Sequence, residues 1–284
     1  MNRIEESTSL TPKPAEPRLA DLFSETVSVA SKGNAARFYA EMMIDLFLSA
    51  RLKNEIGTDR LETIPLGDQI KGISSHTPSK IVDALWHIKD FGDKASHYSL
   101  GRALTEAEAD AAVEDAVGLI VLILTNELIE TPLDACSGRA TLFSTILPKA
   151  RERVLANLLS ECHPSNGHYY RFLLHKYGLA LTKSGRLGAA RRHLSRLLKK
   201  GCIDQAFHDE LVEALWLLDK SIKYPGQPIA QRMEDVARNF ETVRLGLNDD
   251  EAKANERLIG ILGTLVNDII PSGFNHRVTQ LLLF

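Results

Sequence analysis

The chain has 284 residues, of which 44% are hydrophobic and 25% are charged, and its formal net charge is −3. This is the composition of a globular protein with one or two domains, and the charge gives no overall attraction to nucleic acid or to an anionic membrane. Only 6% of the residues are aromatic, while leucine and alanine are abundant, which favours helices over sheets.

The cysteines and the N-terminal segment bear on the cellular compartment. Cys136, Cys162 and Cys202 are isolated in the sequence, and an odd number without paired spacing suits a reducing cytoplasm rather than a disulfide framework. The N-terminal segment has no apolar core of a secretory signal. The most apolar run, 117–124, is too short to span a bilayer. We therefore expect a soluble, cytoplasmic protein that does not enter a membrane.

The N-terminal half predicts a tail followed by helices. Residues 1–18 contain three prolines among polar side chains, which predicts a disordered tail. A break is expected at Gly33, with the next helix ended by Gly57. Helices are also expected at 66–73 and from residue 80, the second interrupted or kinked at Gly92.

An acidic helix follows. Thr105 and Glu108 have the spacing of a capping box, which predicts a helix that runs to about Glu130. No lysine or arginine occurs between Ala103 and Gly138, but eight acids do: Glu106, Glu108, Asp110, Glu114, Asp115, Glu127, Glu130 and Asp134. Such a run is either a solvated acidic face or a surface that binds a basic partner.

The second half is again helical. Residues 131–144 contain Pro132 and Ser137-Gly138 and few periodic apolar residues, so they are the candidate domain junction. Helices are expected near 148–162, 169–183, 186–200, 205–223, 229–245 and 249–270, and no stretch alternates as a strand would. We predict an all-α fold with a disordered tail at 1–18, a helical bundle at 19–131 and a second helical domain at 142–284. Trp86 and Trp216, which have helical spacing with leucines, are expected in the core.

Segment 86–98, WHIKDFGDKASHY, carries a family resemblance. Together with the order of helices over 35–130, about a third of the chain, it resembles the HEPN group of all-helical domains. The closest pattern is that of a bacterial branch of helical domains that occur alone or attached to restriction and defence proteins. That branch reads isoleucine-arginine, two residues, glycine-asparagine, three residues, histidine. The matching positions here are Ile88-Lys89, Gly92-Asp93 and His97.

The resemblance implies a helical bundle that often dimerises and that, in active members, cleaves RNA without a metal. His97 would deprotonate the ribose 2′-hydroxyl, and Lys89 or Lys94 would stabilise the negative transition state. Lysine lacks the bidentate fork of arginine, and Asp93, in the asparagine position, would repel the phosphate. Both departures argue against an efficient ribonuclease. The alternative is that His97 starts a helix and hydrogen-bonds the preceding loop.

A second candidate site is basic. Between residues 183 and 200 there is no acid, and the seven cations are Lys183, Arg186, Arg191, Arg192, Arg196, Lys199 and Lys200. On a helix, Arg192, Arg196 and Lys199 share one face, which predicts a phosphate-binding ridge. The alternatives are a solvated face or one paired with an acidic helix. Arg186 and His193 also match the looser arginine–histidine spacing of HEPN nucleases.

Other chemistry has no sequence support. Cys162, His163, His168 and His175 match no closed zinc site, and there is no phosphate loop, dinucleotide fingerprint or nucleophile elbow. We expect no metal and no cofactor. The leading hypothesis is a defence-related protein that binds RNA or DNA, whose enzymatic activity, if present, is that of a metal-independent endoribonuclease. The alternative is a catalytically inert module that forms a homodimer or binds a protein partner through the acidic helix at 105–130.

Overall fold

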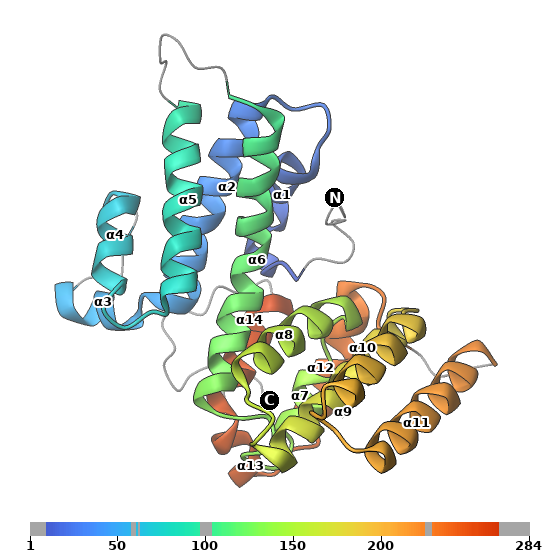
Figure 1. Ribbon diagram of the computed structural model, residues 1–284. Coiled ribbons are helices and arrows are strands. Elements are labelled where there is room, and N and C mark those ends of the chain that lie inside the picture. Colours follow the sequence, from blue (N-terminus) through green and yellow to red (C-terminus); the bar gives the residue numbers. More distant parts are fainter. Residues whose placement is uncertain (1–9, 58–60, 62, 97–103, 225–228, 267–284) are drawn as a thin grey trace. The chain divides into compact units, whose positions relative to one another are not determined.

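A computed structural model describes residues 10–57, 61, 63–96, 104–224 and 229–266. Over these residues the secondary structure is helical and contains no strand, which confirms the predicted all-α class (Figure 1). The chain divides into two compact units. The first unit comprises residues 1–126 and 259–284, and the second unit comprises residues 127–258.

The first unit contains α1 (Glu16–Phe23), α2 (Val29–Met43), α3 (Ala50–Ile56), α4 (Leu66–Ile73), α5 (Ser79–Ser96), most of α6 (Glu106–Glu130) and α14 (Glu256–Val266) from Ile259 onward. A 3₁₀ turn, η2 (Lys13–Ala15), precedes α1, and a π-helical turn, η3 (Ile44–Leu48), joins α2 to α3. At η3 the hydroxyl of the buried Ser49 donates to the carbonyl of Asp45 at 2.7 Å. Helices α2, α5 and α6 lie side by side (Figure 1).

The N-terminal segment differs from the prediction. Helix α1 begins at Glu16, and Pro17 occupies its first turn, where the missing amide hydrogen removes no hydrogen bond. Leu10 and Ala15 are each only 2% exposed. The prediction of a disordered tail is therefore wrong for residues 10–18, because this segment has apolar side chains to bury. Residues 1–9 lie outside the described part of the chain.

Two glycines allow α2 and α5 to pack closely. Helix α2 continues through Gly33 and α5 continues through Gly92, so the predicted break at Gly33 and the interruption at Gly92 are both wrong. A Cβ on Gly33 would lie 2.5 Å from the Cβ of Ala95, and one on Gly92 would lie 2.9 Å from the Cβ of Arg37. Both distances are below van der Waals contact, so the missing side chains permit the contact between the two helices.

Local end signals are confirmed at several helices. Gly57 ends α3 in the left-handed region at a φ of 66°. The capping box before α6 is present, since the Glu108 amide donates to the Thr105 hydroxyl at 3.2 Å and the Thr105 amide donates to the Glu108 carboxylate at 3.1 Å. The apolar stripe of α6 is buried, including Ala116, Ile120 and Leu124.

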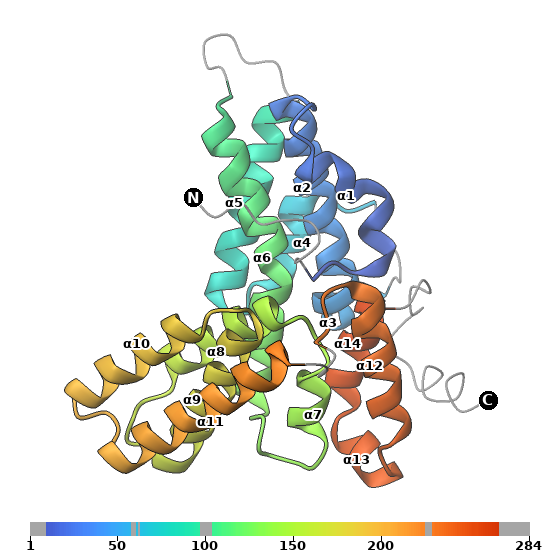
Figure 2. The same cartoon turned by 90° about the vertical axis from the view of Figure 1, so that its right-hand side faces the viewer.

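The second unit contains α7 (Arg139–Phe143), α8 (Pro148–Glu161), α9 (Gly167–Lys183), α10 (Leu187–Lys199), α11 (Gln205–Lys223), α12 (Met233–Leu245) and α13 (Asp249–Ala254). Helices α8 to α11 follow one another across short turns (Figure 2), and their core includes Leu174, Leu181, Leu194 and Leu215. Gly185 and Gly201 adopt positive φ values of 74° and 69° at two of these turns, a conformation that favours glycine.

Two further details of the second unit differ from the prediction. The single helix expected at 249–270 is split into α13 and α14 at Asn255, which is fully buried and donates from Nδ2 to the carbonyls of Ser137 and Glu251. Trp216, expected in the core, is 44% exposed on α11. Its ring lies 3.6 Å from the Lys220 ammonium, one helical turn away, so this tryptophan is covered by a cation rather than by apolar neighbours.

The predicted junction at 131–144 is part of the core of the second unit. It contains α7, with Leu142 and Phe143 buried. Arg139, 1% exposed, donates from Nη2 to Glu127 Oε1 at 2.7 Å and from Nε to the Thr131 carbonyl at 2.9 Å. The boundary between the units falls at 126/127, and the chain from Ile259 groups with the first unit, so the units differ from the predicted 19–131 and 142–284.

Glu127, one of the eight acids expected on a solvated or partner-binding face, is instead buried. Its side chain is 2% exposed, and its second oxygen lies 2.9 Å from Nε of Arg257, which also pairs with Glu130. Removing one member of a buried ion pair leaves the other charge uncompensated, whereas apolar replacement of both partners does not.

The Glu127–Arg139 pair gives a prediction about stability. The Arg139→Met variant should lose about 3–5 kcal/mol of unfolding free energy because Glu127 remains buried without its main partner. The double variant Glu127→Met/Arg139→Met should be more stable than either single variant. Urea unfolding followed by circular dichroism measures this, and additive losses in the double variant would contradict the prediction.

The Gly33 contact gives a second prediction. Gly33→Ala should destabilise the protein by about 1–3 kcal/mol through overpacking against Ala95, although alanine is the better helix former. Gly188→Ala is the matched control, since a Cβ there would meet only the flexible end of Arg192 at 3.5 Å. The control should unfold at the same or a higher urea concentration than the unsubstituted protein, and equal effects of both substitutions would argue against close packing at Gly33.

Candidate functional site

The residues assigned by the HEPN resemblance lie on α5 or just beyond it. His97 lies outside the described residues. Lys89 and Asp93 are one helical turn apart, with Lys89 Nζ 2.6 Å from Asp93 Oδ2. The other oxygen of Asp93 accepts from Arg37 Nη1 of α2 at 2.5 Å. Asp93 therefore neutralises two cations and links α2 to α5.

Lys89 is held in this arrangement by its surroundings. Its side chain is 21% exposed. The side chain lies so close to Gly67 of α4 that a Cβ added there would be 3.0 Å from Cε of Lys89. The hydrogen bond from Lys89 to Asp93 raises the pKa of the Lys89 ammonium, against the opposing effect of burial. The positive charge of Lys89 is thus already compensated within the protein and is poorly placed to stabilise a phosphorane-like transition state.

Arg37 completes this cluster and was not identified from the sequence. Its Nε also lies 3.3 Å from Glu41 Oε1, an i,i+4 pair that is the one local signal for its position. The contact with Asp93 spans 56 positions in the chain, so it follows only from the packing of α2 on α5. The cluster of Arg37, Glu41, Lys89 and Asp93 has the character of a structural ion-pair network.

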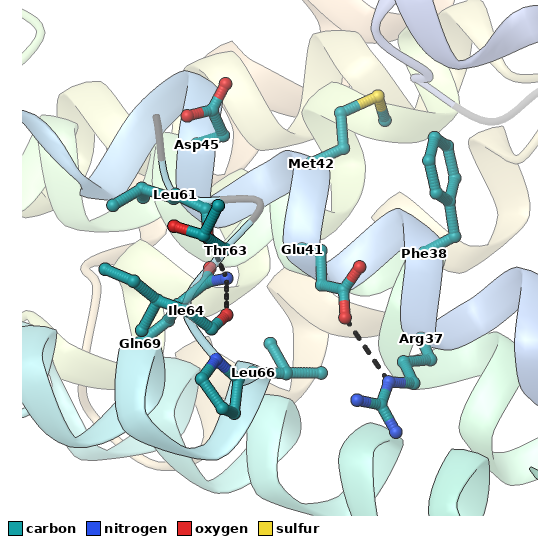
Figure 3. A pocket seen from close by; sticks show the side chains of 11 residues that line it. Arg37, Phe38, Glu41, Met42, Asp45, Leu61, Thr63, Ile64, Leu66 and Gln69 are labelled. Carbon is teal, nitrogen blue, oxygen red and sulfur yellow. Dashed lines mark hydrogen bonds and ion pairs between the residues drawn. The ribbon is translucent and has the colours of Figure 1, made fainter. Parts of the chain in front are cut away.

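A pocket of about 620 Å³ adjoins Arg37 in the first unit. Figure 3 shows Arg37, Glu41 and Asp45 on α2 and η3, facing Leu61, Thr63, Ile64 and Gln69. Gln69, 3% exposed, donates to the carbonyls of Leu61 and Ile64, while its Oε1 atom has no hydrogen-bond partner in the described part of the chain. Asp45 pairs with Lys53 at 2.7 Å. The charges of the wall are therefore paired, and the described side chains that line the pocket include Thr63 but no serine, cysteine or histidine.

The seven predicted cations of the second unit fall into three groups. Arg186 pairs with Glu152 of α8, and Lys183 is partly buried. The remaining five are exposed, and none of them has an ion-pair partner among the described residues; this basic face consists of Arg191, Arg192, Arg196, Lys199 and Lys200. Ala190 and Leu194 are buried on the other side of α10, which orients the basic face outward.

His193 belongs to the packing of α10 rather than to a catalytic pair. Its ring meets the Tyr177 ring edge-on, with centroids 5.4 Å apart and planes at 78°. Burial, followed by the charge of Arg196, lowers the pKa of His193, so the imidazole is neutral at pH 7. Arg186, its partner in the looser HEPN spacing, is engaged by Glu152.

The acidic helix α6 has several of its carboxylates occupied within the chain. Glu106 pairs with Lys32 at 3.1 Å, and Asp115 pairs with His87. Glu127 and Glu130 pair with Arg139 and Arg257, as described above. The acidic surface available to a basic partner is therefore smaller than the sequence indicates.

The Asp93 cluster can be tested as a structural element. Asp93→Ala should lower the unfolding free energy by about 1–3 kcal/mol, since two charge-assisted hydrogen bonds are removed and two cations face each other. Asp90→Ala is the control, because Asp90 is 63% exposed and lies 3.6 Å from Lys89; its effect should stay below about 0.5 kcal/mol. Urea denaturation measures the unfolding free energy of both variants. Equal unfolding free energies of Asp93→Ala and Asp90→Ala would contradict a structural role of Asp93.

Comparison with known proteins adds no family to this description. No protein-family model, curated protein or solved structure matches the chain. In the part of the chain that the structure describes, no three histidine, cysteine, aspartate or glutamate side chains are grouped to hold a metal ion. No helix in the same residues is long and apolar enough to cross a membrane. The two candidates that remain are the Asp93 cluster and the basic face of α10.

Proposed function

We propose that this protein binds single-stranded RNA through the basic face of α10 and does not cleave it. The observation that carries the proposal is the set of five exposed cations on and just after α10 that have no ion-pair partner among the described residues. Two exposed cations elsewhere, Lys71 of α4 and Arg238 of α12, are by contrast paired with carboxylates three residues away.

Electrostatics supports a polyanion as the ligand of this surface. Cations that are not paired within the protein can displace the counterions of a phosphate backbone, which makes binding favourable and dependent on salt. Arg192 and Arg196 lie one turn apart on α10, so both can contact the same strand. The choice of RNA over DNA rests on the resemblance of segment 86–98 to HEPN domains.

The state of the α5 residues supports binding without cleavage. A cation that stabilises a transition state must be available to the phosphate, whereas Lys89 is hydrogen-bonded to Asp93. Asp93 is itself shared with Arg37. Both side chains would have to leave existing partners before they could take part in the reaction.

Fluorescence anisotropy with a mixed-sequence single-stranded RNA tests this function. Affinity should fall as salt rises, and Arg192→Ala/Arg196→Ala should reduce the slope of log K against log salt by about 1.4, or about 0.7 for each phosphate that is no longer neutralised. The control, Lys71→Ala/Arg238→Ala, removes the same charge from exposed side chains of α4 and α12 and should keep the original slope.

Two outcomes would contradict the proposal. If the unsubstituted protein does not bind RNA at about 50 mM salt, or if the two double variants behave alike, the basic face of α10 is not the binding surface. If the RNA is cut during the measurement and His97→Ala prevents the cutting, the statement that the protein does not cleave RNA is wrong.

A further inference from the structure

Arg151 of α8 is a buried cation. Its residue is 7% exposed, and among the described residues its Nε atom has no hydrogen-bond partner. Within the described residues, no carboxylate forms an ion pair with its guanidinium. An arginine side chain remains protonated in proteins, so this positive charge is removed from water without compensation, an arrangement that is strongly unfavourable unless an anion is supplied.

Two lysines belong to α9, the helix that packs against the helix of Arg151. Helices α8 and α9 pack against each other across a short turn, 162–166 (Figure 2). Lys176 and Lys183 are seven positions apart on α9 and therefore share one face. Both lysines are partly buried. Lys176 Nζ lies 5.2 Å from the centroid of the Phe172 ring, and among the described residues this is the one favourable contact of either ammonium group.

The pKa shifts of the three groups indicate that the two lysines feel the charge of Arg151. Burial lowers the pKa of Arg151 to about 10. Burial and then the charge of Arg151 lower the pKa of Lys176. Burial, followed by the charges of Arg151 and Lys176, lowers the pKa of Lys183. The ammonium charges of Lys176 and Lys183 are thus each opposed by a neighbouring cation.

The nearest acid in the sequence does not relieve this repulsion. Glu152 follows Arg151 in α8 and is buried, but one of its oxygens accepts from Arg186. Successive side chains on a helix point about 100° apart, which directs Glu152 away from the side on which Arg151 lies. The pKa shifts of Arg151, Lys176 and Lys183 arise from burial and from cations alone.

We propose that Arg151, Lys176 and Lys183 form a binding site for a phosphate group. The planar guanidinium of Arg151 offers a bidentate pair of donors, and the two ammonium groups supply mobile point charges on flexible stems. The phosphate has two sources, a free or small phosphorylated molecule and a backbone phosphate of RNA bound at the basic face of α10. The site does not depend on the proposed RNA binding, since either source neutralises the cluster.

The melting temperature of the full chain in inorganic phosphate, compared with sodium chloride of equal ionic strength, tests this site. A ligand that binds only the folded state raises the melting temperature as its concentration rises. The unsubstituted protein should show a phosphate-specific rise that is absent in Arg151→Met. That variant should also melt at a higher temperature than the unsubstituted protein when phosphate is absent, because a buried uncompensated charge has been removed.

A second variant and a control keep the test decisive. Lys183→Met changes a partly exposed residue and should fold even if Arg151→Met does not. This variant should need at least tenfold more phosphate than the unsubstituted protein for the same rise in melting temperature. Lys223→Met removes an exposed cation of α11 and should respond as the unsubstituted protein does, which corrects for general stabilisation by phosphate salts. A rise of equal size in all of these proteins, or no rise beyond that in chloride, would overturn the proposal.

The RNA measurement distinguishes the two sources of phosphate. If phosphate at constant ionic strength weakens RNA binding by the unsubstituted protein but not by Lys183→Met, the site holds a backbone phosphate. If phosphate raises the melting temperature and leaves RNA affinity unchanged, the site holds a free phosphate or phosphorylated molecule. An intact phosphate response in Arg192→Ala/Arg196→Ala, together with no RNA binding by any protein, would overturn the proposed function and keep the site.

Discussion

The buried ion pair of Glu127 and Arg139 is the interaction on which the second unit depends. Arg139 donates to the carboxylate of Glu127 and to the carbonyl of Thr131, which fixes the end of α6 against α7. Arg257 reaches the other oxygen of Glu127 from a position 130 residues further along the chain. Charges this deeply buried are tolerated only when each has its partners, so the three segments must assemble together.

The cations discussed in the two units differ in whether a carboxylate pairs with them. In the first unit, Arg37 and Lys89 converge on Asp93, and the α5 motif becomes part of the packing between helices. In the second unit, the basic face of α10 and the group around Arg151 have no such carboxylate among the described residues. Lys89 and Asp93 of this motif are therefore paired within the protein, whereas the anion binding that we propose is assigned to α8, α9 and α10.

Local signals in the sequence predicted much of the fold but not its contacts. The all-α class, the Thr105–Glu108 box and the turn at Gly57 depend on neighbouring residues and were predicted correctly. Gly33 was interpreted as a break because the reason for a glycine there is Ala95 on another helix. The residues of the basic face were identified from their spacing, but Arg151 was missed, since it stands beside Glu152 and its isolation arises only from burial.

The π-helical turn η3 has a consequence for how this chain tolerates change in length. A π turn contains one residue more than the α-helical turn it replaces. Deleting one residue between Ile44 and Leu48 would therefore give a regular α-helical turn and keep the later side chains near their present directions. Deleting one residue from the regular part of α2 would instead rotate everything after it by about 100° about the helix axis. After that second deletion Leu52, which now lies 2.6 Å from where a Cβ on Gly72 would be, would leave the surface of α4. A one-residue deletion is thus accommodated by the turn itself but not by the regular helix before it, while Ile44 and Leu46 of the turn are constrained by their burial.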